Sequence, residues 1–106
     1  MSVDFDLSGP LYGQSAACEP VLRALPDWFG IEAALQQYAA EINLLPTFLA
    51  STPEGVVGFL SLKPHNPYAA EIYVMGVIQA AHRQGIGRAL AAEAEKWLLM
   101  QGVEYL

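Results

Sequence analysis

The sequence has little cysteine, no long apolar run and no leader-like start. Its single cysteine, Cys18, cannot form a disulfide within the chain, which argues against a disulfide-stapled secreted domain. No apolar run reaches the roughly eighteen residues of a membrane-spanning helix, and the first residues lack the basic and apolar segments of a signal peptide. We therefore expect a soluble cytoplasmic protein with no membrane partner, in which Cys18 is a small buried side chain.

Basic residues are also scarce. Lys and Arg number 5 against 11 Asp and Glu, giving a net charge of −6 that argues against a nucleic-acid partner. Three of these bases, Arg83, Arg88 and Lys96, nevertheless fall in one short segment. That clustering has two interpretations, a bound anionic ligand or the solvated face of a helix. With only two histidines and one cysteine, we expect no Cys/His metal site.

What the chain does have is apolar residues, 54% of its 106, enough for one core and a single domain over residues 1–106. Residues 3–7 alternate like a strand that Ser8-Gly9-Pro10 should end, and 71–78 reads as a central strand covered on both faces. The other predicted elements are helices over 15–25, 31–44 and 86–100, strands over 47–51 and 56–62 around a turn, a loop over 63–67, and a strand beginning at 103. This order predicts an α+β fold of mixed layers.

The most informative segment lies between the strand at 71–78 and the helix at 86–100, where positions 85 and 87 are glycines. An anion at a helix N-terminus gains hydrogen bonds from unpaired N–H groups, and glycine lets the backbone approach it closely. Arg83 and Arg88 add charged donors. The pattern predicts a phosphate or pyrophosphate ligand, although an ordinary strand-to-helix turn is the alternative. A Walker loop is absent, and a dinucleotide fingerprint fails because its third glycine position is Leu90.

The string His82-Arg83-Gln84-Gly85-Ile86-Gly87 resembles the acetyl-CoA-binding motif of the GNAT superfamily of N-acetyltransferases, Gln/Arg-x-x-Gly-x-Gly/Ala, with His82 at the Gln/Arg position. The predicted order of elements is also similar to that superfamily's order through its fifth strand. The resemblance implies the GNAT acyl-CoA N-acyltransferase fold, a central, mostly antiparallel sheet flanked by helices in the order β-α-α-β-β-β-α-β. It further implies a chain truncated after the fifth strand, with an open edge that could form a homodimer.

The same resemblance assigns a role to each part of the segment. The backbone of Met75 and Val77 would pair with the pantetheine arm of acetyl-CoA as an added strand would. The residues that would cradle the pyrophosphate, largely through backbone amides, are His82, Arg83, Gln84, Gly85, Ile86, Gly87 and Arg88.

Glu71 is the candidate general base, because it stands fourteen residues before Gly85, the offset of the catalytic glutamate in the histone-acetylating branch of the family. Tyr73 is a candidate for orienting the substrate or a water. On a regular strand Glu71, Tyr73, Met75 and Val77 would share one face, which places the carboxylate beside the pantetheine. The alternatives are a solvated glutamate at a strand end and a tyrosine that only packs.

Trp28 and Phe29 lie where the family usually builds its acceptor site, although core packing is the simpler interpretation. His65 is expected to be a solvated residue of its loop. The function implied by the resemblance is acetyl-CoA-dependent N-acetylation of a primary amine on a small molecule or a protein, by direct attack with general-base help. The alternatives are a non-catalytic acyl-CoA-binding or regulatory module, an inactive truncated fragment, and a partner protein that keeps only the fold.

Overall fold

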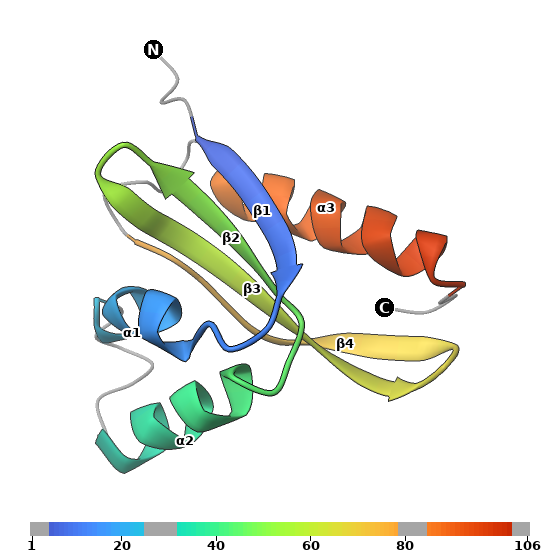
Figure 1. The fold of residues 1–106 in the computed structure, drawn as a ribbon, viewed down its shortest axis with the longest axis horizontal. Coiled ribbons are helices and arrows are strands. Elements are labelled where there is room, and N and C mark those ends of the chain that lie inside the picture. Colours follow the sequence, from blue (N-terminus) through green and yellow to red (C-terminus); the bar gives the residue numbers. More distant parts are fainter. Residues whose placement is uncertain (1–4, 25–31, 79–84, 103–106) are drawn as a thin grey trace.

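The computed structural model describes residues 5–24, 32–78 and 85–102, which form one sheet between two helical layers (Figure 1). The elements in chain order are β1 (Asp6–Leu11), α1 (Ser15–Arg23), α2 (Glu32–Ile42), β2 (Thr47–Thr52), β3 (Gly55–Asn66), β4 (Ala69–Val77) and α3 (Ile86–Met100). The described sheet has the order β1-β2-β3-β4, and each neighbouring pair is antiparallel. The predicted α+β class and element order are thereby confirmed for the described residues, while the strand expected from 103 lies outside them.

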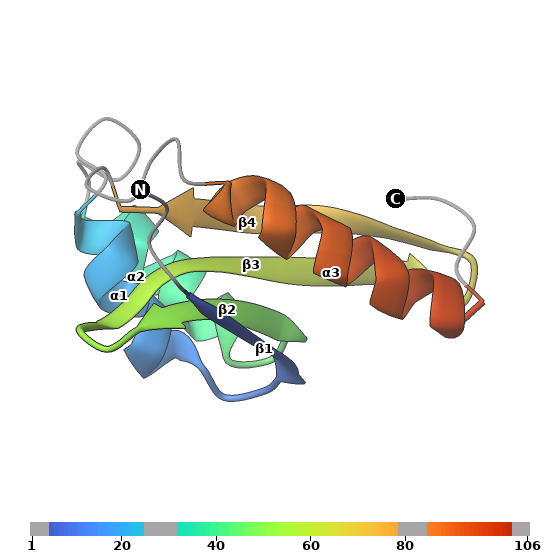
Figure 2. The same cartoon turned by 90° about the horizontal axis from the view of Figure 1, so that it is seen from above.

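Helix α3 covers one face of the sheet, and α1 and α2 cover the other (Figures 1 and 2). Each helix buries residues spaced three or four apart, as an amphipathic helix on a sheet must. The α3-side core contains Phe48, Ala50, Val57, Leu60, Leu62, Ala70, Ile86, Leu90, Ala94 and Leu98. The α1/α2-side core contains Cys18, Val21, Leu22, Leu35, Ile42, Leu49, Phe59 and Val74. The prediction that Cys18 is buried is confirmed.

Strand β1 does not end where the sequence suggested. It runs from Asp6 to Leu11 straight through Ser8-Gly9-Pro10, with a shift in register against β2 between Ser8 and Leu11. Proline is tolerated because β1 is an edge strand of the described sheet. Glycine at position 9 has a packing reason, since a Cβ there would lie 2.7 Å from the Thr47 carbonyl oxygen.

Strand β3 is longer than predicted, because Lys63-Pro64-His65-Asn66 continues the strand instead of forming a loop. The N–H of Leu62 donates to the Pro46 carbonyl at 3.0 Å, on the β2 side of β3. Because backbone groups alternate along a strand, the nitrogen of Pro64 faces the β2 side as that of Leu62 does. At that point β2 has no residue left to pair with it. The missing N–H of Pro64 therefore costs no ladder hydrogen bond.

Strand β4 is the last strand of the described sheet. The prediction that it is covered on both faces is wrong. Glu71, Ile72 and Met75 are exposed. The apolar run therefore reflects a strand whose outward residues are apolar without being buried by any described element.

The helices match the sequence patterns closely. Helix α3 occupies the predicted 86–100, and the N–H of Gly102, at φ +82°, donates to the Leu99 carbonyl at 3.1 Å just beyond its end. Helices α1 and α2 lie within the ranges predicted for them. No helix among the described residues has the length and apolar character needed to cross a membrane.

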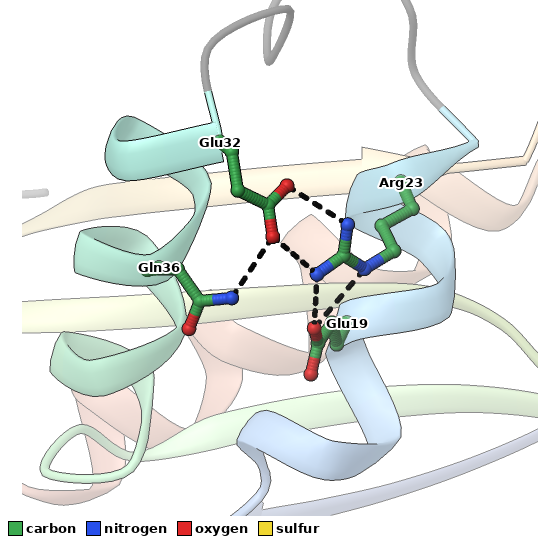
Figure 3. A network of polar contacts seen from close by, with 4 residues as sticks. All are labelled: Glu19, Arg23, Glu32 and Gln36. Carbon is green, nitrogen blue, oxygen red and sulfur yellow. Dashed lines mark hydrogen bonds and ion pairs between the residues drawn. The ribbon is translucent and has the colours of Figure 1, made fainter.

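An ion-pair network joins α1 to α2 at the surface (Figure 3). The Arg23 guanidinium donates to Oε1 of Glu19 at 2.7 Å and to the two carboxylate oxygens of Glu32 at 2.8 and 2.9 Å. Gln36 Nε2 also donates to Glu32, at 3.0 Å. These hydrogen bonds, chiefly those from Arg23, lower the pKa of Glu32 to about 2. The network holds the last turn of α1 against the first turn of α2.

Candidate functional site

The beginning of α3 presents uncapped backbone donors. Gly85, the N-cap residue, has a left-handed conformation (φ +77°), and no described side chain caps the helix. The first turn contains no acidic residue, and Arg88 is exposed within it. The N–H groups and positive dipole end of this turn therefore lack an anionic partner among the described residues, and such a helix end suits an external anion.

Gly85 and Gly87 occupy this turn for different reasons. The backbone conformation of Gly85 requires glycine, which is the ordinary turn explanation. Gly87 has no such requirement, because it lies in the helix and, among the described residues, a Cβ there would meet only Val77 Cγ2, at 3.9 Å. Glycine within a helix costs about 1 kcal/mol relative to alanine. Neither strain nor packing against a described residue explains Gly87.

Gly58 of β3 brings the start of α3 onto the end of β4, a role that the sequence analysis missed. A Cβ on Gly58 would lie 3.2 Å from the Gly76 carbonyl oxygen, 3.2 Å from Ile86 Cγ2 and 3.3 Å from Val77 Cγ2. The available signal was a glycine inside an apolar strand, which often marks the close approach of another backbone.

A bulge in β4 redistributes the side chains of the site between the two faces of the sheet. Ile72 pairs with Leu62 and Val74 pairs with Ser61, so Tyr73 is an extra residue without a partner in β3. Tyr73 and Val74 consequently both pack toward the α1/α2-side core.

This bulge corrects the expectation that Glu71, Tyr73, Met75 and Val77 share one face. Glu71 lies opposite Lys63 and, like Tyr73, is on the α1/α2 side of the sheet. Met75 lies opposite Leu60 of the α3-side core, and Val77 packs against that core. The candidate base and the residues predicted to pair with pantetheine therefore lie on opposite faces of β4.

Glu71 and Tyr73 belong to a group of polar and aromatic side chains that we call the α2–β4 cluster. Its members are Tyr38, Glu41, Lys63, His65, Glu71 and Tyr73.

Within the α2–β4 cluster, Lys63 Nζ lies 3.2 Å from Glu41 Oε1 and 5.2 Å from the centroid of the Tyr73 ring. The Tyr73 ring centroid is 5.5 Å from that of Tyr38. These contacts join α2 to β3 and β4 and give the site an aromatic wall beside two carboxylates. Lys63 is the cation that these surroundings already hold.

The Tyr73 phenol stays protonated in this setting. Burial, followed by the nearby charge of Glu41 and the Tyr38 phenol, raises the pKa of Tyr73, while Lys63 opposes the shift. The phenol is therefore neutral at physiological pH. Lys63 engages the Glu41 carboxylate, whereas the Glu71 carboxylate is exposed and in contact with His65.

Several predicted residues can now be placed. Residues 85–88 form the first turn of α3, whereas His82, Arg83 and Gln84 lie outside the described residues, as do Trp28 and Phe29. Within the described part of the chain, no three His, Cys, Asp or Glu side chains group as metal ligands would.

The sequence analysis expects His65 in a loop, but the residue lies on β3. Its Nε2 atom is 3.3 Å from Glu71 Oε1. The histidine is half-exposed and in contact with the candidate base. This contact could not be anticipated while β3 was predicted to end at 62.

Comparisons with known proteins fit these observations. The model of the "Acetyltransferase (GNAT) family" matches residues 16–106. No curated protein matches the sequence significantly.

Many solved structures share the fold. The PaiA N-acetyltransferase of Thermoplasma acidophilum, in complex with coenzyme A, has a TM-score of 0.74 and 18% identity, over 95% of this chain and 76% of that one. The ribosomal-protein-S18-alanine N-acetyltransferase of Escherichia coli has a TM-score of 0.77 and 18% identity, over 94% and 63%. AAC(6')-Iy, in complex with the bisubstrate analogue CoA-S-monomethyl-acetylneamine, has a TM-score of 0.72 and 16% identity, over 96% and 76%.

Proposed function

Because the chain belongs to the GNAT family of acetyltransferases, we propose that it transfers the acetyl group of acetyl-CoA to a primary amine of a small molecule or a protein. The observation that supports this most strongly is Gly87, a helical glycine that neither backbone conformation nor packing explains. A pyrophosphate held against the first turn of α3 supplies the missing reason, because a side chain there would stand between the phosphates and the amides.

The residues present fit coenzyme A, which is also bound in the T. acidophilum structure of the same fold. The first-turn amides of α3 and the Arg88 guanidinium offer donors to the pyrophosphate. His82, Arg83 and Gln84 complete the proposed loop. Met75 and Val77 of β4, of which Val77 lies beside Gly87, would accompany the pantetheine along the strand.

The two substrates would reach β4 from opposite faces. The proposed pyrophosphate site is on the α3 side, whereas Glu71 and the α2–β4 cluster are on the α1/α2 side. An acyl group carried along β4 would then meet an amine arriving over the cluster. Because Lys63 already engages Glu41 and lies over the Tyr73 ring, the exposed Glu71 carboxylate is the group that favours an acceptor arriving as an ammonium ion.

Acetyl transfer requires that this ammonium lose a proton first. Glu71 would accept that proton, directly or through a water, and so free the nitrogen lone pair. The amine then attacks the thioester carbonyl and the new C–N bond forms. The C–S bond breaks as the thiolate leaves with the electron pair, and the proton still carried by the nitrogen passes to that sulfur, which gives the amide and the free thiol. The Tyr73 hydroxyl, kept neutral by its raised pKa, would orient the amine or a water.

Thiol release with a panel of primary amines tests the proposed function. We expect acetyl-CoA to be consumed with at least one amine, and Glu71→Gln to lower kcat by at least about 100-fold, the usual effect of removing a general base. Glu54→Gln, which removes an exposed carboxylate from the turn between β2 and β3, is the matched control. Unchanged turnover in Glu71→Gln would remove Glu71 from the mechanism, and acetyl-CoA binding without turnover would identify a non-catalytic binding module.

A further inference from the structure

The Lys63 ammonium fills a small cation site built by α2 and β4. Its Nζ atom donates a hydrogen bond to Glu41 Oε1 at 3.2 Å and lies 5.2 Å from the centroid of the Tyr73 ring. That ring in turn lies against Tyr38, with the two centroids 5.5 Å apart. A carboxylate beside the face of an aromatic ring is an arrangement that binds ammonium groups. Lys63 of β3 is the group that occupies it.

The occupied cation site lies at the surface. The side chains of Lys63 and Glu41 are 40% and 34% exposed, and Tyr73 is partly exposed as well. An amine dissolved in water could therefore reach the same carboxylate and the same ring if the Lys63 side chain did not cover them.

The candidate base stands next to this site. Glu71 is the direct partner of Lys63 in the ladder between β3 and β4, and side chains opposite each other in this way have Cβ atoms about 5 Å apart. The Lys63 ammonium nevertheless contacts Glu41, while the Glu71 carboxylate is exposed. Two carboxylates thus lie near each other on one face of the sheet, one with a cation supplied by the chain and one open to a cation from solution.

We propose that Lys63 is a specificity-determining residue that occupies the second of two neighbouring cation sites, so that the acceptor binds through one ammonium group, at Glu71. This inference rests on the proposed function, in which the acceptor amine meets Glu71. A diamine could span both sites only by displacing the Lys63 ammonium from Glu41 and Tyr73. The favoured acceptors are therefore primary amines with no second positive charge close to the first, and a diamine gains nothing from its second one.

The test compares diamines of four, five and six carbons, charged at both ends, with the amino alcohols of the same lengths. Each compound competes with the amine that gives the fastest thiol release, at saturating acetyl-CoA. For the wild type, we expect no diamine to bind more than about twofold more tightly than its amino alcohol, because its two equivalent ends alone allow that factor. In Lys63→Ala, at least one diamine should bind about five- to tenfold more tightly, the usual effect of an exposed ion pair with a cation–π contact.

Matched variants separate the cation site from other effects of the substitution. Lys63→Gln keeps a long side chain without charge, and it should shift the preference in the same direction even if Lys63→Ala does not fold. Lys63→Arg keeps the cation and should retain the wild-type preference. Adding Glu41→Gln to Lys63→Ala removes the carboxylate of the site, so the gain should disappear. Lys96→Ala, which removes an exposed cation from α3, is the control for net charge.

The outcomes distinguish this inference from the proposed function. If the wild type already binds a diamine about fivefold more tightly than its amino alcohol, the role of Lys63 is wrong. The same holds if Lys63→Ala and Lys63→Gln keep the wild-type preference, if no compound competes, or if the gain survives Glu41→Gln. In each of these cases continued thiol release leaves the proposed function standing. If no amine is acetylated, the proposed function and the role of Lys63 fail together.

Discussion

Cys18 shows how burial controls a single functional group. Its side chain is inaccessible to solvent in the α1/α2-side core, and burial raises the pKa of the thiol to about 12. Because the thiolate is the reactive form, the group should be inert near neutral pH while the chain is folded.

We therefore predict that a thiol reagent such as DTNB labels Cys18 at pH 8 at least about 100-fold more slowly in the native chain than in urea. The urea-unfolded chain serves as the control for reagent access. Equal rates in the two states would mean that the packing of α1 on the sheet is wrong.

Residue-scale patterns explain why the sequence located the glycine turn but not the geometry of β4. Gly85 and Gly87 are visible in the sequence because glycine at those positions has a local meaning. The extra residue at Tyr73 is a property of pairing with β3, and no periodicity within β4 encodes it. The assignment of Glu71 to a face was wrong for that reason.

At the scale of elements, Gly58 controls how closely α3 approaches the sheet. Gly58→Ala would place a methyl group 3.2 Å from the Gly76 carbonyl oxygen and 3.2 Å from Ile86 Cγ2. We expect it to lower the free energy of unfolding in urea by about 1–3 kcal/mol, the usual cost of overpacking.

Gly87→Ala is the matched comparison for Gly58→Ala. Alanine fits that position without a close contact and should raise the free energy of unfolding by about 0.5–1 kcal/mol. If the two variants changed the free energy of unfolding in the same direction, this description of how α3 lies on β3 and β4 would be contradicted.

The Arg23 network makes the contact between α1 and α2 depend on pH. The pKa of Glu32 is lowered from 4.5 to about 2, so its stabilising contribution is present above pH 4.5 and is lost as the pH falls toward 2. The effect should be small, because the groups are exposed.

We predict that Arg23→Met lowers the urea midpoint at pH 6, and that its difference from the wild type shrinks steadily between pH 5 and 2.5. Lys96→Met, which removes an exposed cation from α3, should show no such trend. If the difference in urea midpoint between Arg23→Met and the wild type stays constant with pH, protonation of Glu32 does not weaken its ion pair with Arg23.

The elements themselves were largely predictable, and their ends were less so. The helices follow local spacing of apolar residues and glycine, so α3 was placed at its observed bounds. Pro10 and Pro64 were interpreted as strand breakers, yet both lie on strands. A proline is harmless where no neighbouring strand needs its N–H, and that depends on the pairing of strands distant in the sequence.

At the scale of the whole molecule, the sheet separates the glycine turn from the α2–β4 cluster. The glycine turn and exposed Arg88 lie on the α3 side, and the carboxylates and tyrosines of the α2–β4 cluster lie on the α1/α2 side. With a net charge of −6, the chain keeps basic residues where the proposed anionic cofactor binds. The arrangement supports an acetyltransferase in which cofactor and acceptor approach β4 from different faces.

Calorimetric titration with acetyl-CoA tests this account most directly, by comparing the wild type with Gly87→Glu and Ala92→Glu. Gly87 has room for a side chain, so its glutamate variant should fold normally but place bulk and negative charge against the pyrophosphate. Ala92→Glu adds the same charge at an exposed position further along α3. We predict binding by the wild type and by Ala92→Glu, and none by Gly87→Glu at about 1 mM ligand. Absence of binding by the wild type, or equal binding by folded Gly87→Glu, would contradict the proposed cofactor site.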